Sequence, residues 1–416
     1  MSNINIRAID LFSGCGGLSE GLAQAGIDVG IATDHWDVAL ETYKNNHSSS
    51  HTLCCDASVF LQRLSDDSGL RHLASEIDLI VGGPPCQGFC GINRHRTPAD
   101  PRNSLIEVYF SIIGSLKPKY FIMENVNGIL SLAGGKSFNN LLTSFKGIGY
   151  AVSYSIIQAG GFGVPQNRWR VFLLGSYKKM PPLLPPKPLF SFPRMPIFDA
   201  GIASKNAIWP LQRCSNQFFA PIEHINVKDA IGDLCALDNG GTSKAFKPKI
   251  KRQTRYTRFL NPRMVKITSH ECATLGETSM ERVRALPPDS GASWIDLPFD
   301  LQPENLRKLP DIRYKNRYGR LLWDGIFNTI LHKPEPYWGR VIHPRENRLI
   351  SVRESARAQS FPDDFRFSGS IADKYLQVGN SVPPILGMFL GWQVRAALGE
   401  KEIPNLIELY GKSMSS

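Results

Sequence analysis

One cysteine lies in a sequence context that could make it a nucleophile. Cys86 follows a Gly-Gly-Pro-Pro sequence at positions 82–85, which itself follows an apolar run at positions 77–81. The apolar run predicts a buried strand, which the prolines end because proline has no N–H to donate to a sheet ladder. Open α/β sheets carry their reacting groups at the carboxyl ends of strands. A thiolate held there by a stiff loop is suited to covalent attack, so Cys86 is a candidate nucleophile.

An acid and two arginines accompany other predicted strands. Glu124 directly follows the apolar run at 120–123, so we expect its carboxylate at the same sheet edge as Cys86. Arg168 and Arg170 alternate in a segment that leads into a further apolar run, and alternate residues of an extended segment project from one face. The set suits covalent catalysis in which a thiol attacks, an acid transfers a proton and an arginine orients the acid or holds an oxygen.

A glycine-rich turn near the N-terminus predicts a ligand site. Residues 10–19 read as a strand end, a turn containing Gly14 and Gly16, and a helix start, and glycine lets the backbone approach a ligand closely. The dinucleotide fingerprint Gly-x-Gly-x-x-Gly fails because Ser19 occupies its last position, so a ligand without a phosphate fits better. Asp34, at the tip of the second predicted strand, suits ribose hydroxyls, and Trp36 beside it suits adenine.

Short apolar runs alternate with helical patterns over about the first 178 residues, which predicts an α/β fold with a mostly parallel sheet flanked by helices. We expect strands at 7–11, 29–33, 78–81, 120–123, 153–158 and 170–174, and helices at 18–25, 37–45, 105–116 and 138–148. Gly26 and Gly149 follow two of these helices as expected C-terminal caps.

The rest of the chain predicts a second domain and a return to the first. Seven prolines between positions 180 and 196 predict a linker, and periodicity is weak from about 198 to 348. An apolar stretch at 383–398 is compatible with a helix that packs back on the first domain. We therefore expect a catalytic domain at 1–190, a smaller inserted domain at 191–349, and a return to the catalytic domain at 350–416.

Composition favours a polyanionic partner. The chain has 416 residues, a net charge of +11 and a pI of about 9.2. Between Asn239 and His270 there are nine lysines and arginines, three aromatic residues and no acid, which predicts a phosphate-contacting surface. The eight cysteines form no Cys-x-x-Cys pair, so the pattern disfavours a zinc or iron–sulfur site and fits a reducing cytoplasm. Neither a signal pattern nor an apolar run of membrane-spanning length is evident.

Taken in order, these segments resemble the DNA cytosine-5 methyltransferases. The likeness covers residues 10–19, Gly-Gly-Pro-Pro-Cys-Gln-Gly-Phe at 82–89, Glu-Asn-Val at 124–126 and Gln-Asn-Arg-Trp-Arg at 166–170, and it continues at 316–324, 334–344, 351–362 and 377–384. It implies a Rossmann-like, S-adenosylmethionine-dependent methyltransferase sheet with an inserted target-recognition domain. The implied activity is methyl transfer from S-adenosylmethionine to carbon 5 of an extruded cytosine in a specific duplex DNA sequence.

The resemblance also assigns roles to residues. Cys86 would form a covalent adduct at carbon 6 of the cytosine, Glu124 would protonate or hydrogen-bond ring nitrogen 3, and Arg168 and Arg170 occupy the motif's arginine positions. The loop at 88–102 would be a mobile lid over the extruded base. No metal site is expected. Cofactor contacts would come from Phe12, Gly14, Gly16, Asp34, Trp36, Asp56, Pro85, Leu105, Asn380 and Val382.

Two alternatives stay open. A tRNA cytosine-5 methyltransferase would share the fold, although Cys90 and Gly91 depart from that subfamily's usual loop and the large basic insert disfavours it. A catalytically silent DNA-binding regulator would be expected to have lost the nucleophile or the acid, and both are present. For a DNA methyltransferase we expect a cytoplasmic monomer that acts on double-stranded DNA without a membrane, with a cognate restriction endonuclease as a candidate functional partner.

Overall fold

The structure is a computed structural model that describes residues 4–85, 104–192, 222–308 and 314–400. The chain forms two compact units. The first contains residues 1–162, 169–223 and 382–405, and the second contains residues 163–168, 224–381 and 406–416. Among the helices that the structure describes, none has both the length and the apolar character needed to cross a membrane.

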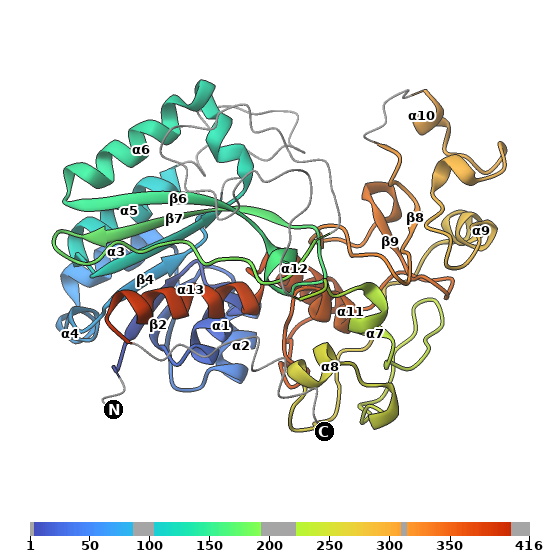
Figure 1. Ribbon diagram of the computed structural model, residues 1–416, viewed down its shortest axis with the longest axis horizontal. Helices are drawn as coiled ribbons and strands as arrows, with labels where there is room; N and C mark the ends of the chain where they lie inside the picture. The colour runs from blue at the N-terminus through green and yellow to red at the C-terminus, as the bar shows by residue number, and fades with distance from the viewer. Residues whose placement is uncertain (1–3, 86–103, 193–221, 309–313, 401–416) are drawn as a thin grey trace. The chain divides into compact units, whose positions relative to one another are not determined.

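The first unit is built on a seven-stranded sheet with the order β3-β2-β1-β4-β5-β7-β6 (Figure 1). Strands β1 to β5 pair in parallel, and β7 is antiparallel to both of its neighbours. Each of the six predicted strands overlaps an observed one, so the predicted α/β sheet is confirmed. The strands are β1 (Arg7–Leu11), β2 (Asp28–Asp34), β3 (His51–Cys54), β4 (Leu79–Gly82), β5 (Tyr120–Asn125), β6 (Tyr150–Gln158) and β7 (Trp169–Tyr177).

Helices cover both faces of this sheet (Figure 1). Ile31 of β2 lies in the apolar core formed with α3 to α6, whereas its neighbour Ala32 packs with Leu40 and Tyr43 of α2 on the opposite face. The helices are α1 (Gly17–Gln24), α2 (Asp37–Asn46), α3 (Ala57–Asp66), α4 (Ser68–Ser75), α5 (Ser104–Leu116), α6 (Lys136–Gly147) and α13 (Pro384–Ala397), with short 3-10 helices η3 (Asn127–Gly135) and η4 (Ala159–Phe162).

The last helix returns to the N-terminal part of the chain, as its apolar sequence predicts. Helix α13 packs against α1, and a Cβ added to Gly21 of α1 would lie 2.1 Å from the carbonyl oxygen of Pro384. The absence of a side chain at Gly21 therefore permits this close approach. The predicted caps Gly26 and Gly149 are confirmed, because both adopt the left-handed backbone conformation, with φ of 75° and 98°.

Strand β3 and the helices α3 and α4 of the first unit were not predicted, and neither were the short 3-10 helices η3 and η4. Strand β3 is a partly exposed edge strand whose outer residues His51 and Cys54 are exposed, so it lacks an apolar alternation. Helices α3 and α4 follow it directly. A signal for α3 was present, because Ala57, Phe60 and Leu64 are buried at helical spacing.

The second unit consists of short elements joined by long loops, in agreement with its weak periodicity. Its apolar core includes Trp294, Leu306 and Ile342. The elements are α7 (Val227–Ile231), η5 (Ile250–Arg252), α8 (Arg255–Leu260), α9 (Glu277–Ala285), η6 (Trp294–Asp296), α10 (Glu304–Arg307), β8 (Gly319–Arg320), η8 (Pro336–Trp338), β9 (Arg340–Ile342), α11 (Val352–Ala358) and α12 (Ile371–Asn380).

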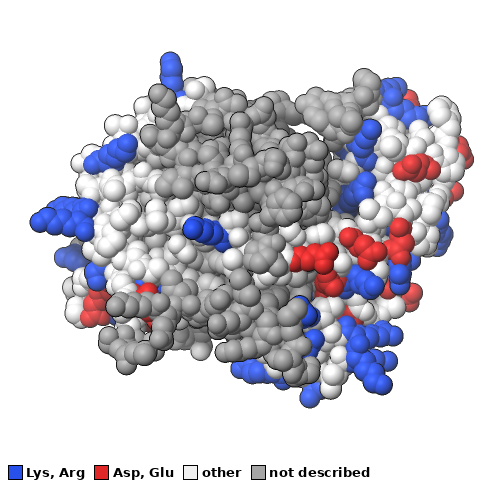
Figure 2. Space-filling view, in the orientation of Figure 1, with Lys and Arg blue, Asp and Glu red and all other residues white. Residues whose placement is uncertain are grey.

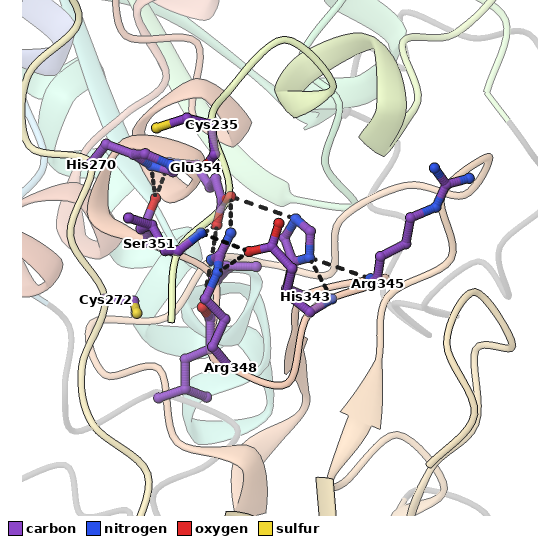
Figure 3. Close-up of polar contacts among 12 residues, drawn as sticks. Cys235, His270, Cys272, His343, Arg345, Arg348, Ser351 and Glu354 are labelled. Atoms are coloured by element: carbon purple, nitrogen blue, oxygen red, sulfur yellow. Dashed lines mark hydrogen bonds and ion pairs between the residues drawn. The ribbon is translucent and has the colours of Figure 1, made fainter. Parts of the chain in front are cut away.

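A buried polar network replaces part of the apolar core in this unit (Figure 3). Arg348 donates two hydrogen bonds to the carboxylate of Glu354, each 2.8 Å long. His270 Nδ1 lies 2.9 Å from the Ser351 hydroxyl, and His343 Nδ1 accepts backbone N–H groups. Burial alone would raise the pKa of Glu354, but the adjacent Arg348 charge holds it well below its usual value. The network is therefore anchored by a permanently ionised pair.

Candidate active site

The carboxyl ends of four parallel strands lie along one edge of the sheet. Leu11 at the end of β1 pairs with Thr33 of β2 and with Gly82 of β4, and Gly82 pairs with Met123 of β5. The strand order reverses direction between β1 and β4, since β2 and β3 follow on one side and β4 and β5 on the other. Open α/β sheets bind ligands at such a switch point. The loops after β1 and β4 are the two glycine-containing segments that the sequence singled out.

The loop after β1 is held by the carboxylate of Asp34. Gly14 N donates to Asp34 Oδ2 at 2.8 Å, and Trp36 N donates to Asp34 Oδ1 at 2.9 Å. Gly16 has φ of 96°, and a Cβ there would lie 2.8 Å from Cδ2 of Tyr43, so only glycine fits. Phe12 also has a positive φ, 58°, which is uncommon for an aromatic residue and marks local strain. The glycines therefore favour the conformation of the loop, whereas at Phe12 the surrounding structure holds the backbone in a conformation that the residue disfavours.

Asp10, a buried acid in β1, contacts the start of the helix that follows this loop. Asp10 accepts a hydrogen bond from the Ser19 hydroxyl at 2.6 Å, and Tyr43 donates to the same hydroxyl at 2.9 Å. Burial raises the pKa of Asp10 to about 7. The hydrogen bond from Ser19 lowers this pKa, and the nearby Asp34 charge raises it by a smaller amount. Sequence reasoning assigned no role to Asp10 or Tyr43. A buried carboxyl at a strand end preceding the glycine loop was the available signal.

The segment leading to the candidate nucleophile is fixed by the end of β5. Asn125 Nδ2 donates to the carbonyl oxygen of Pro84 at 3.1 Å. A Cβ added to Gly83 would lie 3.2 Å from Oε2 of Glu124, so the acid rests directly over the glycine backbone. Cys86 itself lies outside the described residues, as does the expected lid at 88–102. The contact of Asn125 with Pro84 was not predicted, because it depends on the pairing of β4 with β5.

Glu124 forms an ion pair with Arg170 at the start of β7. The distance from Arg170 Nε to Glu124 Oε1 is 2.9 Å, and both side chains are largely buried, with 15% and 13% exposed. Because β7 is antiparallel to β5, its first residues lie at the edge where β5 ends. Arg170 therefore orients the acid and compensates its charge.

Arg168 belongs to the second unit and has different partners. Only 2% of it is exposed, and its Nη2 donates to the carbonyl oxygen of Ser381 at 2.9 Å. Both terminal nitrogens also lie 3.4 Å from the carbonyl oxygen of Gly379. The guanidinium therefore fixes the backbone on either side of Asn380.

The remaining expected cofactor contacts are distributed over both units. Asp34, Trp36 and the glycine loop lie at the described sheet edge, with Pro85 at the end of the β4 loop. Asp56 is exposed immediately before α3, and Leu105 is half-buried at the start of α5. Val382 is buried in the first unit, whereas Asn380 is exposed at the end of α12 in the second.

The predicted basic stretch is exposed in the second unit. Lysine and arginine side chains gather around α8 (Figure 2). Lys249, Lys251, Arg252 and Arg255 are all exposed. Of the interleaved aromatic residues, however, Tyr256 is 1% exposed and donates its hydroxyl proton to a backbone carbonyl of α11, so it is a core residue. The surface thus offers cations for an anionic partner without that aromatic side chain.

Comparison with known proteins connects this arrangement to one family. The family model for the C-5 cytosine-specific DNA methylases matches residues 6–395. DNA (cytosine-5)-methyltransferase 3 of Arabidopsis thaliana is 32% identical over 452 residues, which cover 96% of this chain and 31% of that protein. DNA (cytosine-5)-methyltransferase 1 of Gallus gallus is 29% identical, over 95% of this chain and 30% of that protein. The chain therefore spans about a third of the length of these curated relatives.

Solved structures give the same result. A putative DNA modification methyltransferase encoded within an E. coli prophage superposes with a TM-score of 0.67 at 26% identity, covering 95% of this chain and 100% of that chain. The Dnmt2 methyltransferase of S. pombe shares the fold, with a TM-score of 0.53 at 16% identity over 95% of this chain and 100% of that chain. With the family match extending over nearly the whole sequence, the chain belongs to the C-5 cytosine-specific DNA methylase family.

Proposed function

We propose that this protein transfers a methyl group from S-adenosylmethionine to carbon 5 of cytosine in a specific sequence of duplex DNA. The observation that carries the proposal is the Glu124–Arg170 pair, which lies over Gly83 at the sheet edge, three residues before Cys86. An acid with a matched cation beside the nucleophile loop is the arrangement that attack on a cytosine ring requires. The family membership of the chain supports the same reaction.

The loop after β1 fits S-adenosylmethionine. A Cβ added to Gly14 would meet nothing within 4 Å, so the loop presents an open backbone face on which a ligand can rest. The Ser13 hydroxyl is buried and, among the described residues, has no hydrogen-bond partner. Asp34 Oδ1 accepts the N–H of Trp36 and lies 3.2 Å from His35 Nδ1, whereas Oδ2 accepts the N–H of Gly14 and retains a lone pair for a ribose hydroxyl. When bound there, S-adenosylmethionine would supply an electrophilic methyl group.

The chain's own groups would activate the cytosine. The Cys86 thiolate would add to carbon 6, and Glu124 would protonate or hydrogen-bond ring nitrogen 3 as negative charge develops. Carbon 5 would then become nucleophilic enough to take the methyl group. Transfer of the carbon 5 proton to solvent water would restore the double bond and expel the thiolate. Arg170 would hold Glu124 in place throughout, and Arg168 would fix the backbone around Asn380.

Binding to duplex DNA would use the basic stretch around α8. Cations along a DNA backbone release condensed counterions, so we expect affinity to fall steeply with salt concentration. We propose that residues 191–349 recognise the target, that the cytosine is extruded from the helix, and that the 88–102 loop closes over it. A restriction endonuclease partner, a monomeric state and a cytoplasmic location stay predictions.

A mechanism-based trap tests this proposal. Cytosine with fluorine at carbon 5 cannot complete the elimination, because fluorine does not leave as a cation. Target DNA containing 5-fluorocytosine, mixed with S-adenosylmethionine, should therefore form a denaturation-resistant adduct at Cys86, identified by peptide mass spectrometry. The matched Cys86→Ala protein should form none.

The same assay separates the alternatives. Methylation of an exocyclic amine needs no attack on the ring, so its target would not be trapped. Trapping of fluorinated tRNA but not DNA would favour the tRNA methyltransferase, and binding of DNA without any turnover would favour the silent regulator. The absence of an adduct on DNA proven to contain the methylated site would overturn the reaction class.

A further inference from the structure

Arg317 differs from the other buried arginines of the second unit. Arg320, Arg348, Arg353 and Arg357 each donate hydrogen bonds to several carbonyl or carboxylate oxygens. Arg317 is also buried, with 8% exposed, but within the described part of the chain no oxygen accepts from its guanidinium. Its Nη1 in particular is shut off from solvent without a partner.

Aromatic rings surround this guanidinium. Its central carbon lies 4.1 Å from the ring centre of Tyr337, 4.4 Å from that of Tyr314 and 5.3 Å from that of Trp338. The Tyr337 hydroxyl accepts a hydrogen bond from Asn305 at 3.2 Å, so that ring is held by a contact of its own. The guanidinium therefore lies in an aromatic enclosure, and the Tyr337 wall is fixed independently of Arg317.

The backbone around the enclosure is fixed as well. Tyr318 N donates to the carbonyl oxygen of Pro336 at 2.6 Å, and Gly319 N donates to that of Gly339 at 3.3 Å. These bonds hold the segment of Arg317 against the segment of Tyr337 and Trp338. Tyr318 has φ of 48°, a left-handed conformation that a bulky residue rarely adopts and that tends to persist at functional sites.

An arginine in this state lacks acceptors. Aromatic faces attract the charge and offset part of the cost of burial, but they offer no lone pairs in the plane of the guanidinium for its N–H groups. A buried polar group without a partner is unfavourable. The other four arginines each donate to several oxygens, and although Nε of Arg320 is also without a partner, its terminal nitrogens donate to five oxygens. A ligand that brings two acceptors in one plane would complete the arrangement.

We propose that Arg317 reads a guanine of the bound DNA in the major groove; this rests on the proposed function of the chain. The O6 and N7 atoms of guanine are two coplanar acceptors that a guanidinium contacts together. The flat edge of a base suits an enclosure with aromatic walls, and Trp338, 48% exposed, provides an apolar surface at its rim. Arg317 is therefore a specificity-determining residue, held ready by Tyr314, Tyr337 and Trp338.

Mapping of methylated sites tests this proposal. Bisulfite sequencing of DNA methylated by the wild-type protein should show a sequence context with a fixed guanine. For Arg317→Met we expect kcat/KM on that context to fall about 5- to 150-fold, with the preference lost at one position. Arg307→Met is the matched control, because Arg307 is exposed and stacks on Phe299 at 4.3 Å, and it should change neither rate nor context.

Replacement of one atom in the DNA gives a test that does not depend on the folding of a variant. 7-Deazaguanine lacks the N7 acceptor. With this base at the fixed position, the wild-type protein should lose activity, whereas Arg317→Met should have the same activity as it has on DNA with guanine. An unchanged context for Arg317→Met, or indifference of the wild type to 7-deazaguanine, would overturn the proposal. A loss that is equal on all sequences, with the salt dependence reduced by about one charge, would assign Arg317 to a phosphate and also overturn it.

Failure of the proposed function would look different. Wild-type protein that methylates no duplex would overturn the activity itself. Recognition of guanine would then be tested by measuring the affinity of the protein for alternating dG–dC duplexes, with and without 7-deazaguanine, by fluorescence anisotropy. We expect the wild type to bind the guanine duplex several-fold more tightly and Arg317→Met to bind both equally. Equal binding by the wild type would overturn the inference.

Discussion

The sheet edge of the first unit and the arginine network of the second unit position their side chains by different means. At the edge, parallel strands in register bring Asp34 and Glu124 to one line, and backbone N–H groups hold Asp34. In the second unit, side chains hold the backbone. Arg320 alone donates to four carbonyl oxygens of residues far apart in the sequence, and Arg353 donates to three.

This difference indicates which substitutions should disturb each unit. A strand's hydrogen bonds come from its main chain, so many apolar sequences with the right pattern would form the same edge. A loop-rich unit has fewer such bonds, and each buried guanidinium replaces several of them. Single side chains should therefore matter more to stability in the second unit, and single backbone conformations should matter more to function in the first.

The largest expected effect is on the stability of the second unit. Arg357 is fully buried and donates to the carboxylates of Asp233 and Asp363 and to the carbonyl oxygen of Ala230. Arg357→Met would leave two buried carboxylates without a cation. We expect the free energy of unfolding, measured by urea denaturation, to fall by about 3–5 kcal/mol.

An exposed arginine provides the control for that experiment. Arg307→Met removes only a cation–π contact at the surface and should change the free energy of unfolding by less than about 0.5 kcal/mol. Equal effects of the two substitutions would show that buried arginines do not hold the second unit together.

The same difference decides how much could be predicted from the sequence. The strands and helices of the first unit follow apolar periodicity, so their positions and the line of strand ends were predictable. Strand β3 was not predicted, because its position at the edge of the sheet leaves it without an apolar alternation. In the second unit the interpretation of Tyr256 as a surface aromatic was wrong, because its hydroxyl donates to the carbonyl oxygen of Arg357 and draws the ring into the core.

Within the site, residue types were predictable and partners were not. The sequence placed Glu124 and the two arginines near a sheet edge, but did not decide which arginine orients the acid. In the structure Arg170 contacts Glu124, and Arg168 donates to backbone carbonyls of the second unit. Side-chain partners depend on strand register and on loops that have no period, so local pattern does not determine them. The enclosure of Arg317 is hidden in the sequence for the same reason.

The next effect concerns function at the sheet edge. Glu124→Gln keeps the shape of the side chain but removes its charge and its ability to transfer a proton, so turnover should fall by about a hundredfold or more. Single-turnover methylation would measure this change. DNA affinity should stay the same, because Glu124 is largely buried against Arg170. A variant with normal turnover would place the acid elsewhere.

A smaller effect is expected from one backbone conformation. Gly16→Ala forces a side chain into a left-handed position, 2.8 Å from Tyr43. The free energy of unfolding should fall by about 1–3 kcal/mol, and calorimetry should show weaker binding of S-adenosylmethionine. Gly147→Ala in α6 is the control, because its added Cβ meets nothing within 4 Å. Unchanged cofactor affinity in Gly16→Ala would separate the glycine loop from the cofactor site.

Effects of pH are the smallest per step, no more than about 1.4 kcal/mol per pH unit, and they should have opposite signs in the two units. In the first unit, burial raises the pKa of Asp10 to about 7, so the folded protein keeps a proton that the unfolded chain releases near pH 4. In the second unit, burial lowers the pKa of His343, and its Nδ1 accepts N–H groups from Arg345 and Glu346 (Figure 3). The stabilising form of each side chain is therefore the neutral one.

The signs follow from which state binds more protons. As pH rises from about 4 to 7, the contribution of Asp10 to the free energy of unfolding is lost. The free energy of unfolding of Asp10→Asn should therefore rise relative to that of the wild type over that window. As pH falls below about 6.5, the unfolded chain protonates His343 first, so wild type should lose stability that His343→Asn retains. Urea denaturation of the three proteins between pH 4.5 and 8 would measure both differences, whose slopes cannot exceed about 1.4 kcal/mol per pH unit. A constant difference across the range for either variant would mean that the buried group does not change protonation on folding, and the contrast between the two units would then rest on packing alone.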